Sequence, residues 1–182
     1  MIRLFVALEI PEFVKDKLID VRRKIFDDEI NFRWEPKNKI HVTLKFIGDV
    51  QEEILSEIEN DLLFLKTFNK IKCEINNFGF FFRDGIPRIL WSSLALDHSI
   101  NEIVLKLNEE FLKYGIEKER RKFKPHLTLL RLKKNPGADF INSFNNYDFE
   151  PLKFETDKIV LYRSELHKNG SKYFEIKTYH LN

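Results

Sequence analysis

The sequence predicts an α+β fold built on antiparallel sheets. Most of the short apolar runs that are typical of strands are joined by turns, and only a few stretches between them have helical spacing. The two halves of the chain also share one plan: a strand that begins with histidine, a glycine-bearing turn, a helix and further strands. This shared plan indicates an ancient duplication. Because no flexible linker separates the halves, we expect them to pack as one domain over residues 1–182.

The elements of the first half follow from apolar periodicity and turn residues. Residues 4–8 predict a strand, residues 31–34 a short strand, and a turn at 35–38 leads into a strand that begins at His41. Asp49 and Glu52 have the spacing of a helix N-terminal capping pair. Two amphipathic helices are predicted, with apolar faces formed by Phe13, Val14, Leu18, Val21 and Ile25 and by Ile54, Leu55, Ile58, Leu62 and Leu65.

The second half begins with strands at residues 71–75, 78–82 and 88–94. Asp97 is placed to cap a helix that Gly115 ends, with an apolar face formed by Ile100, Ile103, Val104, Leu107 and Phe111. The second histidine strand follows, then a turn at residues 135–137 and a short helix that contains Phe140 and Phe144. Residues 149–179 alternate strands around a turn at 168–170.

The composition favours a globular protein of the cytosol. An apolar fraction of 43% and 18 phenylalanines provide a core. No apolar run approaches the roughly 18–20 residues of a membrane span, so no membrane partner is expected. Arg3 and Glu9 flank the first apolar run, which excludes a secretory signal. Cys73 is a single cysteine and forms no internal disulfide. We expect a cytoplasmic monomer.

The charge is unevenly distributed although the net charge is only +2. Residues 118–134 contain one acid, Glu119, against eight cations: Lys118, Arg120, Arg121, Lys122, Lys124, Arg131, Lys133 and Lys134. Such a run is most often a solvated surface. Because this one brackets the second histidine strand, it favours contact with a polyanion.

One short string occurs twice, 85 residues apart: residues 41–46 (HVTLKF) and 126–131 (HLTLLR). In an extended backbone the histidine and the threonine project to one face and the apolar pair to the other. A buried strand has no need of this polar pair, and still less of two copies. Two such strands face to face would place His41, Thr43, His126 and Thr128 around one small site.

These residue types suit acid–base chemistry on a phosphate. A neutral imidazole accepts a proton from the attacking oxygen, and a protonated one gives a proton to the leaving oxygen. The hydroxyls of Thr43 and Thr128 can donate to the non-bridging oxygens. By strict alternation Lys45 shares the face of His41, whereas Arg131 does not share the face of His126 and needs a strand end or a twist to approach the site.

Other chemistries have weaker support. Two histidines without a recurring carboxylate make a poor metal site, and the six glycines form no nucleotide loop. No G-x-S-x-G string is present. We therefore expect no metal and no cofactor. His98, His167 and His180 have no duplicate and are expected at the surface.

The sequence resembles the two-histidine phosphoesterase superfamily, specifically its RNA 2′,3′-cyclic phosphodiesterase branch, long called 2′-5′ RNA ligases. The resemblance rests on the paired H-x-T-L strings and on segments in the same order along nearly the whole chain: residues 3–8, 33–38, 45–48, 87–91, 123–131 and 164–166, with Gly170 and Tyr173. It implies a two-lobed fold in which each lobe is an antiparallel sheet with helices on its outer face. Both strings would line the central cleft.

The resemblance also implies hydrolysis of an RNA terminal 2′,3′-cyclic phosphate to a 2′-phosphate, for example on tRNA fragments. His41 would be the proton donor and His126 the proton acceptor. Thr43 and Thr128 would bind the phosphate, supported by Arg131 and Lys45. The same chemistry with a 5′-hydroxyl in place of water would form a 2′-5′ linkage without ATP.

Two alternatives remain open. The chain could be a non-catalytic RNA- or nucleotide-binding module, or a phosphodiesterase that acts on 2′-5′ oligonucleotides or small cyclic nucleotides. The aromatic segment at residues 78–82 could stack on bases, although alternation buries at least every second ring. Trp34 and Tyr173 are expected to be framework residues that can border the cleft.

Overall fold

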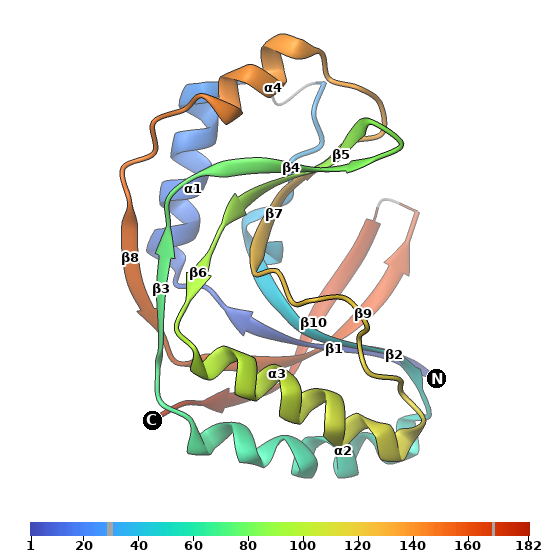
Figure 1. Ribbon diagram of the computed structural model, residues 1–182. Helices are drawn as coiled ribbons and strands as arrows, with labels where there is room; N and C mark the ends of the chain where they lie inside the picture. The colour runs from blue at the N-terminus through green and yellow to red at the C-terminus, as the bar shows by residue number, and fades with distance from the viewer. Residues whose placement is uncertain (29–30, 169) are drawn as a thin grey trace.

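Over residues 1–28, 31–168 and 170–182, which the computed structural model describes, the chain forms three antiparallel sheets (Figure 1). The first has the order β10-β9-β1-β2, with β1 Ile2–Glu9, β2 His41–Val50, β9 Lys158–His167 and β10 Gly170–His180. The second has the order β4-β5-β7, with β4 Phe78–Arg83, β5 Ile86–Ser93 and β7 His126–Arg131. The third has the order β6-β3-β8, with β3 Ile71–Ile75, β6 Ala95–Leu96 and β8 Leu152–Thr156.

Helices cover the sheets from outside. The α-helices are α1 Glu12–Ile25, α2 Leu55–Asp61, α3 Ser99–Glu110 and α4 Ala138–Asn145. Short 3₁₀ helices are η1 Lys37–Lys39, η2 Glu52–Ile54, η3 Leu62–Thr67 and η4 Phe111–Tyr114. In Figure 1, α2 and α3 lie below the four-stranded sheet, and α1 and α4 lie beside the other two sheets. The predicted α+β class with antiparallel sheets is confirmed.

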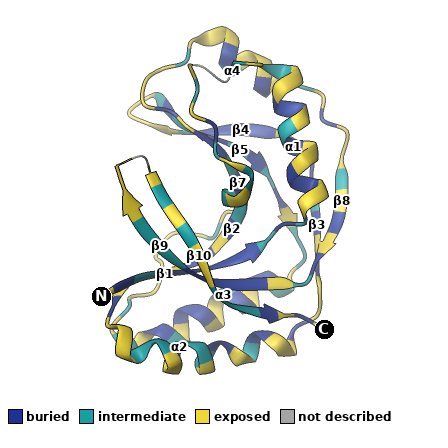
Figure 2. Cartoon of the chain, turned by 180° about the vertical axis from the view of Figure 1, so that it is seen from behind, coloured by how far each residue is buried: buried dark blue, intermediate teal, exposed yellow. Residues whose placement is uncertain are grey.

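The core consists of the apolar faces that these elements turn toward one another (Figure 2). Helix α1 buries Val14, Leu18 and Val21, because these positions recur once per turn on its inner face. Phe13, which the periodicity assigned to the same face, is 59% exposed. No helix in the described part of the chain is long and apolar enough to cross a membrane.

Two local predictions were wrong. Of the strand expected at residues 31–34, only Trp34 pairs, in an isolated bridge to Leu130. Asp49 does not cap a helix, because β2 continues through Val50 and the Asp49 carboxylate takes a two-point ion pair from Arg3, at 2.6 and 3.0 Å. In both cases a contact with a distant segment replaced the local structure.

Other local predictions hold. Asp97 accepts the backbone N–H of Ser99, the first residue of α3, at 3.0 Å. His98, His167 and His180 are exposed. The expected turn at residues 168–170 includes Asn169, which lies outside the described residues.

Gly79 gives room to a ring that supports the second motif strand. A Cβ at this position would overlap the indole of Trp91, the cross-strand partner of Thr128. We expect Gly79→Ala to lower the free energy of unfolding by about 1–3 kcal/mol, because the ring must leave its position. A urea titration measures this loss, and an unchanged midpoint would contradict the overlap.

Candidate active site

The two histidine strands come together from different sheets. Strand β2 is an edge of the four-stranded sheet, β7 is an edge of the β4-β5-β7 sheet, and the two strands contact each other in the middle of the molecule (Figure 1). The segment before β2 joins them, since Glu35 donates its backbone N–H to the carbonyl of Leu129 at 2.8 Å. Edges of two sheets thus meet where the repeated strings lie.

Both strings contain the same β-bulge, which falls at their shared leucine. In the β1–β2 pair, Leu44 has no register partner between Thr43 and Lys45. In the β5–β7 pair, Leu129 has none between Thr128 and Leu130. A bulge turns every later side chain to the opposite face. Strict alternation therefore fails at the same point in both strings.

The bulges reverse two expectations about faces. Arg131, the last residue of β7, comes to the side of His126 and Thr128 because the bulge interrupts the alternation. Lys45 turns away from His41 and is buried. Its Nζ donates to the Oδ1 of Asn108 and to the carbonyl of Glu117, both at 2.8 Å. The placement of Lys45 on the face of His41 was wrong.

The polar residues of the strings line one cavity of about 70 Å³. Its walls are formed by Glu35, Lys39, His41, Thr43, His126, Thr128, Arg131 and Tyr173. A space of this size holds a group of a few heavy atoms. Two imidazoles, two hydroxyls and two cations facing such a space suit a phosphate group.

The His126 ring is oriented by the backbone before its strand. Its Nδ1 lies 2.8 Å from the carbonyl oxygen of Lys124, so Nδ1 carries the hydrogen and donates it. The edge of Phe81 meets the ring, with centroids 4.8 Å apart. In the neutral ring, Nε2 is then the nitrogen with a free lone pair. His126 is therefore arranged to accept a proton at Nε2.

The His41 ring lies in an aromatic box. Phe5 and Tyr162 stack on it at centroid distances of 5.2 and 6.0 Å, and Tyr173 meets it edge-on at 5.5 Å. Burial lowers the pKa of His41 to about 4, and the positive charges of Lys15, Arg131 and His126 act in the same direction. In the free protein the neutral form of His41 is thus favoured at pH 7.

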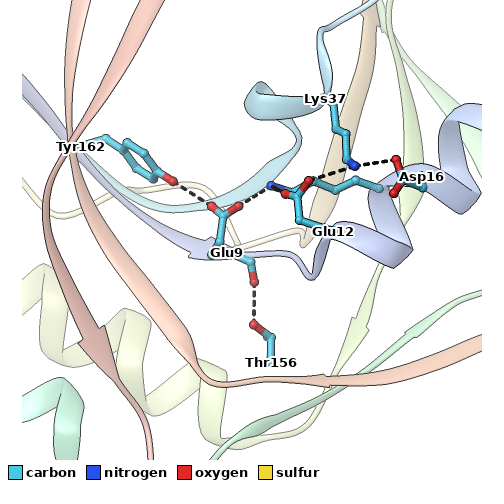
Figure 3. Close-up of polar contacts among 7 residues, drawn as sticks. Glu9, Glu12, Asp16, Lys37, Thr156 and Tyr162 are labelled. Atoms are coloured by element: carbon cyan, nitrogen blue, oxygen red, sulfur yellow. Dashed lines mark hydrogen bonds and ion pairs between the residues drawn. The ribbon is translucent and has the colours of Figure 1, made fainter.

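An ion-pair network surrounds Glu9 (Figure 3). Glu9, the cross-strand partner of His41, accepts a hydrogen bond from the hydroxyl of Tyr162 at 2.8 Å and pairs with Lys15. Lys15 is buried and also contacts Glu12 at 3.1 Å. The backbone carbonyl of Glu9 accepts the hydroxyl of Thr156 at 2.6 Å. The network fixes Tyr162 against His41 and holds a buried cation nearby.

Arg131 is held on the cleft wall by one nitrogen. Its Nε pairs with Oε1 of Glu35 at 3.0 Å, and its side chain remains 63% exposed. The terminal nitrogens of the guanidinium are then available to an anion in the cavity. Lys39, whose Nζ lies 5.5 Å from the ring centre of Tyr173, supplies the second cation of the wall.

The basic run forms an exposed irregular segment that leads into His126. Residues 117–125 have no helix or strand. Lys118 and Arg120 have ion pairs, at 3.6 Å to Glu109 and 3.3 Å to Glu117. Within the described residues, Arg121, Lys122 and Lys124 have none and are exposed. Exposed cations without an ion pair therefore precede the strand that carries His126 in the chain.

Tyr173 lines the cavity, as the sequence allowed. Other residues were not predicted from the sequence as site residues: Glu35 and Lys39 line the cavity, and Glu9 and Lys15 form an ion pair beside the strand of His41. Glu35 and Tyr173 do belong to the segments that carry the family resemblance, which is the signal that could have found them. Of the aromatic segment, Phe78 and Phe80 are buried, and Phe81 touches His126. Among the described residues no group of three or more His, Cys, Asp or Glu could hold a metal ion.

Removal of the Lys45 ammonium is expected to slow acid–base catalysis by the two histidines. The ammonium of Lys45 and the backbone N–H of Glu119 (3.1 Å) both donate to the side chain of Asn108. These two hydrogen bonds fix the start of the irregular segment, and the end of that segment positions His126 through the carbonyl of Lys124. We expect Lys45→Met to lower kcat about tenfold to a hundredfold, because His126 loses its fixed position. Lys106→Met, at an exposed lysine, is the matched control and should change neither kcat nor KM. Full activity of Lys45→Met would contradict this role.

The pKa of His41 is expected to rise when an anion binds. In the free protein, burial and nearby cations disfavour the protonated form of His41, and a bound phosphate adds a negative charge that favours it. The NMR titration of the His41 Cε1 proton should give a pKa of about 4 in the free protein and a higher value in inorganic phosphate. The exposed His167 serves as internal control. A free-protein pKa near 6.5 would contradict the burial of the ring.

Comparison with known proteins agrees with this geometry. The family model described as LigT like Phosphoesterase matches residues 8–91 and 95–173. The RNA 2′,3′-cyclic phosphodiesterase of Methanocaldococcus jannaschii is 34% identical over 180 residues, which cover 96% of this chain and 98% of that protein.

Two crystal structures share the fold. TT0787 of Thermus thermophilus has a TM-score of 0.78 at 22% identity, covering 98% of this chain and 97% of that one. Escherichia coli LigT complexed with 3′-AMP has a TM-score of 0.77 at 21% identity, covering 100% and 98%. Because the family model matches most of this chain, the chain belongs to the LigT-like, two-histidine phosphoesterases.

Proposed function

We propose that this phosphoesterase hydrolyses the 2′,3′-cyclic phosphate at the end of an RNA to a 2′-phosphate. The observation that carries the proposal is the single small cavity faced by His41, Thr43, His126 and Thr128. The name of the Methanocaldococcus jannaschii relative supports the substrate. Hydrolysis of this substrate needs one proton acceptor and one proton donor on opposite sides of phosphorus.

In the proposed step, Nε2 of His126 takes a proton from water, whose oxygen forms the new bond to phosphorus. The bond between phosphorus and the 3′ oxygen breaks, and His41 gives that oxygen a proton. The products are a 2′-phosphate and a free 3′-hydroxyl. Thr43, Thr128 and Arg131 hold the non-bridging oxygens, where charge increases in the transition state. Lys45 has no part in this site, because its ammonium is turned toward Asn108.

The donor role of His41 requires the substrate's charge. In the free protein, burial lowers the pKa of His41 to about 4, which favours the neutral ring. The bound cyclic phosphate is an anion and favours the imidazolium. We therefore expect a bell-shaped dependence of rate on pH, whose two apparent pKa values belong to the pair of imidazoles.

The basic segment favours an RNA end over a free cyclic nucleotide. Arg121, Lys122 and Lys124 are exposed beside the strand that carries His126. Cations that follow a phosphate backbone release counterions on binding, so affinity for an oligonucleotide falls with salt. A mononucleotide lacks the additional phosphates and should show a weaker dependence.

The test is a product analysis. The purified protein is incubated, with chelator and without ATP, with an oligoribonucleotide that ends in a 2′,3′-cyclic phosphate, and ³¹P NMR identifies the oxygen that keeps phosphorus. A 2′-phosphate is expected; a 3′-phosphate, or no product, would overturn the proposal. An oligonucleotide with a 5′-hydroxyl in the same reaction tests the 2′-5′ joining, in which that hydroxyl replaces water.

A further inference from the structure

The proton acceptor and the proton donor of the proposed reaction are held in different ways. His126 is oriented by a hydrogen bond from its Nδ1 to the backbone carbonyl two residues earlier. Around His41, three other strands supply aromatic rings: Phe5 of β1, Tyr162 of β9 and Tyr173 of β10. Stacking defines the direction of a ring less strictly than a hydrogen bond does. The direction of His41 therefore depends on how firmly its aromatic neighbours are held.

Tyr162 is fixed by a hydrogen bond of its own. Its hydroxyl donates to Oε2 of Glu9 at 2.8 Å. Burial and the charge of Glu9 raise the pKa of this hydroxyl, so it keeps its proton and remains the donor. The ring is only 6% exposed and belongs to a small apolar cluster that is separate from the main core. Glu9 thus holds the ring that stacks on His41.

Glu9 is held in turn by Lys15. Glu9 is the cross-strand partner of His41, so the two side chains project from the same face of the sheet. Its Oε1 pairs with the ammonium of Lys15, whose side chain is 3% exposed. A buried ammonium requires an anionic partner, which keeps the carboxylate in place. Burial and then the charge of Lys15 lower the pKa of His41, so the pair lies within electrostatic range of the ring.

The same network anchors the segment that leads into β2 (Figure 3). Glu12 and Asp16 of α1 bind Nζ of Lys37 at 2.9 and 2.5 Å. Lys37 begins η1, four residues before His41. Glu12 also contacts Lys15 at 3.1 Å. The contacts that hold the ring beside His41 therefore also hold the approach to its strand.

We propose that Glu9 is a positioning residue for the proton donor: it holds the Tyr162 hydroxyl and thereby aims the His41 ring at the leaving oxygen. The inference rests on the proposed function, in which His41 protonates the departing 3′ oxygen. A proton is transferred only within hydrogen-bond reach, and a displacement of about 1 Å can cost about a hundredfold in rate. Lys15 supports this role as the buried partner of the carboxylate.

The first experiment separates the donor step from the rest of the reaction. Its substrates are adenosine 2′,3′-cyclic phosphate and the analogue in which sulfur replaces the bridging 3′ oxygen. A thiolate is a weaker base than an alkoxide and leaves phosphorus without a proton. Tyr162→Phe and Glu9→Ala should lower kcat on the oxygen substrate about fivefold to fiftyfold, with little change in KM, and much less on the sulfur analogue. His126→Ala should lose activity on both, because water must still be activated.

A double variant and a control show whether the two residues act as one unit. If Glu9 acts through the hydroxyl, Glu9→Ala with Tyr162→Phe should be no slower than Glu9→Ala alone. The matched control is Tyr179→Phe, at a buried tyrosine of the same sheet whose hydroxyl donates to the backbone carbonyl of Glu59 at 2.9 Å. It should change neither kcat nor KM. If Glu9→Ala fails to fold because Lys15 loses its partner, Tyr162→Phe alone decides the comparison of the two substrates.

A second measurement does not depend on turnover. Glu9→Ala removes no aromatic ring, so a changed NMR shift of the His41 Cε1 proton at about pH 8, where the imidazole is neutral, reports a reoriented ring. Tyr162→Phe should also change this shift, and Tyr179→Phe should not. An unchanged shift in both variants, or equal losses on the oxygen and sulfur substrates, would overturn the role of Glu9.

The outcomes also separate this inference from the proposed function. Hydrolysis of both substrates by the unaltered protein, without a selective effect of Tyr162→Phe or Glu9→Ala, removes the positioning role and leaves the proposed function intact. Absence of hydrolysis in the unaltered protein removes the proposed function. The NMR shift of His41 then still decides whether Glu9 orients the ring.

Discussion

The His126→Ala variant is expected to lose activity on a 2′,3′-cyclic phosphate by a factor of about 10²–10⁴ in kcat. The Lys124 carbonyl binds Nδ1 of the ring, which leaves Nε2 to accept a proton, and His126 lines the cavity. His41→Ala should lose a similar factor, because the leaving 3′ oxygen then departs without a proton. Steady-state kinetics on one oligonucleotide measures both.

The double variant separates a shared mechanism from two independent effects. If the two imidazoles act in one step, His41→Ala with His126→Ala should be little slower than either single variant. His98→Ala and His167→Ala, at exposed histidines, are the controls and should keep full activity. Circular dichroism establishes that each variant is folded. Substantial turnover by a folded His41→Ala or His126→Ala variant would end the two-histidine mechanism.

Thr128→Val is expected to lower kcat by a factor of about 10²–10³, with a smaller change in KM. Valine keeps the shape of threonine and removes the hydroxyl that donates to the phosphate oxygens, where charge increases in the transition state. Thr43→Val should behave alike, since both hydroxyls line the same cavity. Thr128→Ser and Thr43→Ser restore the donor and should recover most of the rate. Full activity of the valine variants, with a loss only in the serine variants, would mean that the methyl group and not the hydroxyl matters.

The basic segment and the network around Glu9 show what a local sequence pattern can predict and what it cannot. The run of cations at residues 118–134 is plain in the sequence, and its place beside His126 follows from its position in the chain. Lys15 gives no such signal, because a lysine on an amphipathic helix is normally solvated. It is buried only because Glu9 and Glu12 meet it there.

Local patterns failed where a distant segment changed the backbone. The strand predicted at residues 31–34 shrank to one bridge at Trp34, since only that residue meets β7. Asp49 has the spacing of a cap, but the guanidinium of Arg3 reaches it from the neighbouring strand. Apolar periodicity and the spacing of capping residues describe the structure that a segment favours by itself. They contain no information about the distant segment that pairs with it in the fold.

The residues of the site can be read from the amino-acid order, because extended backbone places a histidine and the second residue after it on one face whatever surrounds the strand. The α+β class and the family also follow from the order of apolar runs, turns and repeated strings. The meeting of β2 and β7, and the contact of Arg131 with Glu35 across 96 residues, depend on how the sheets pack. The bulges at Leu44 and Leu129 arise from pairing with β1 and β5, and this pairing decides that Arg131 faces the cleft while Lys45 does not.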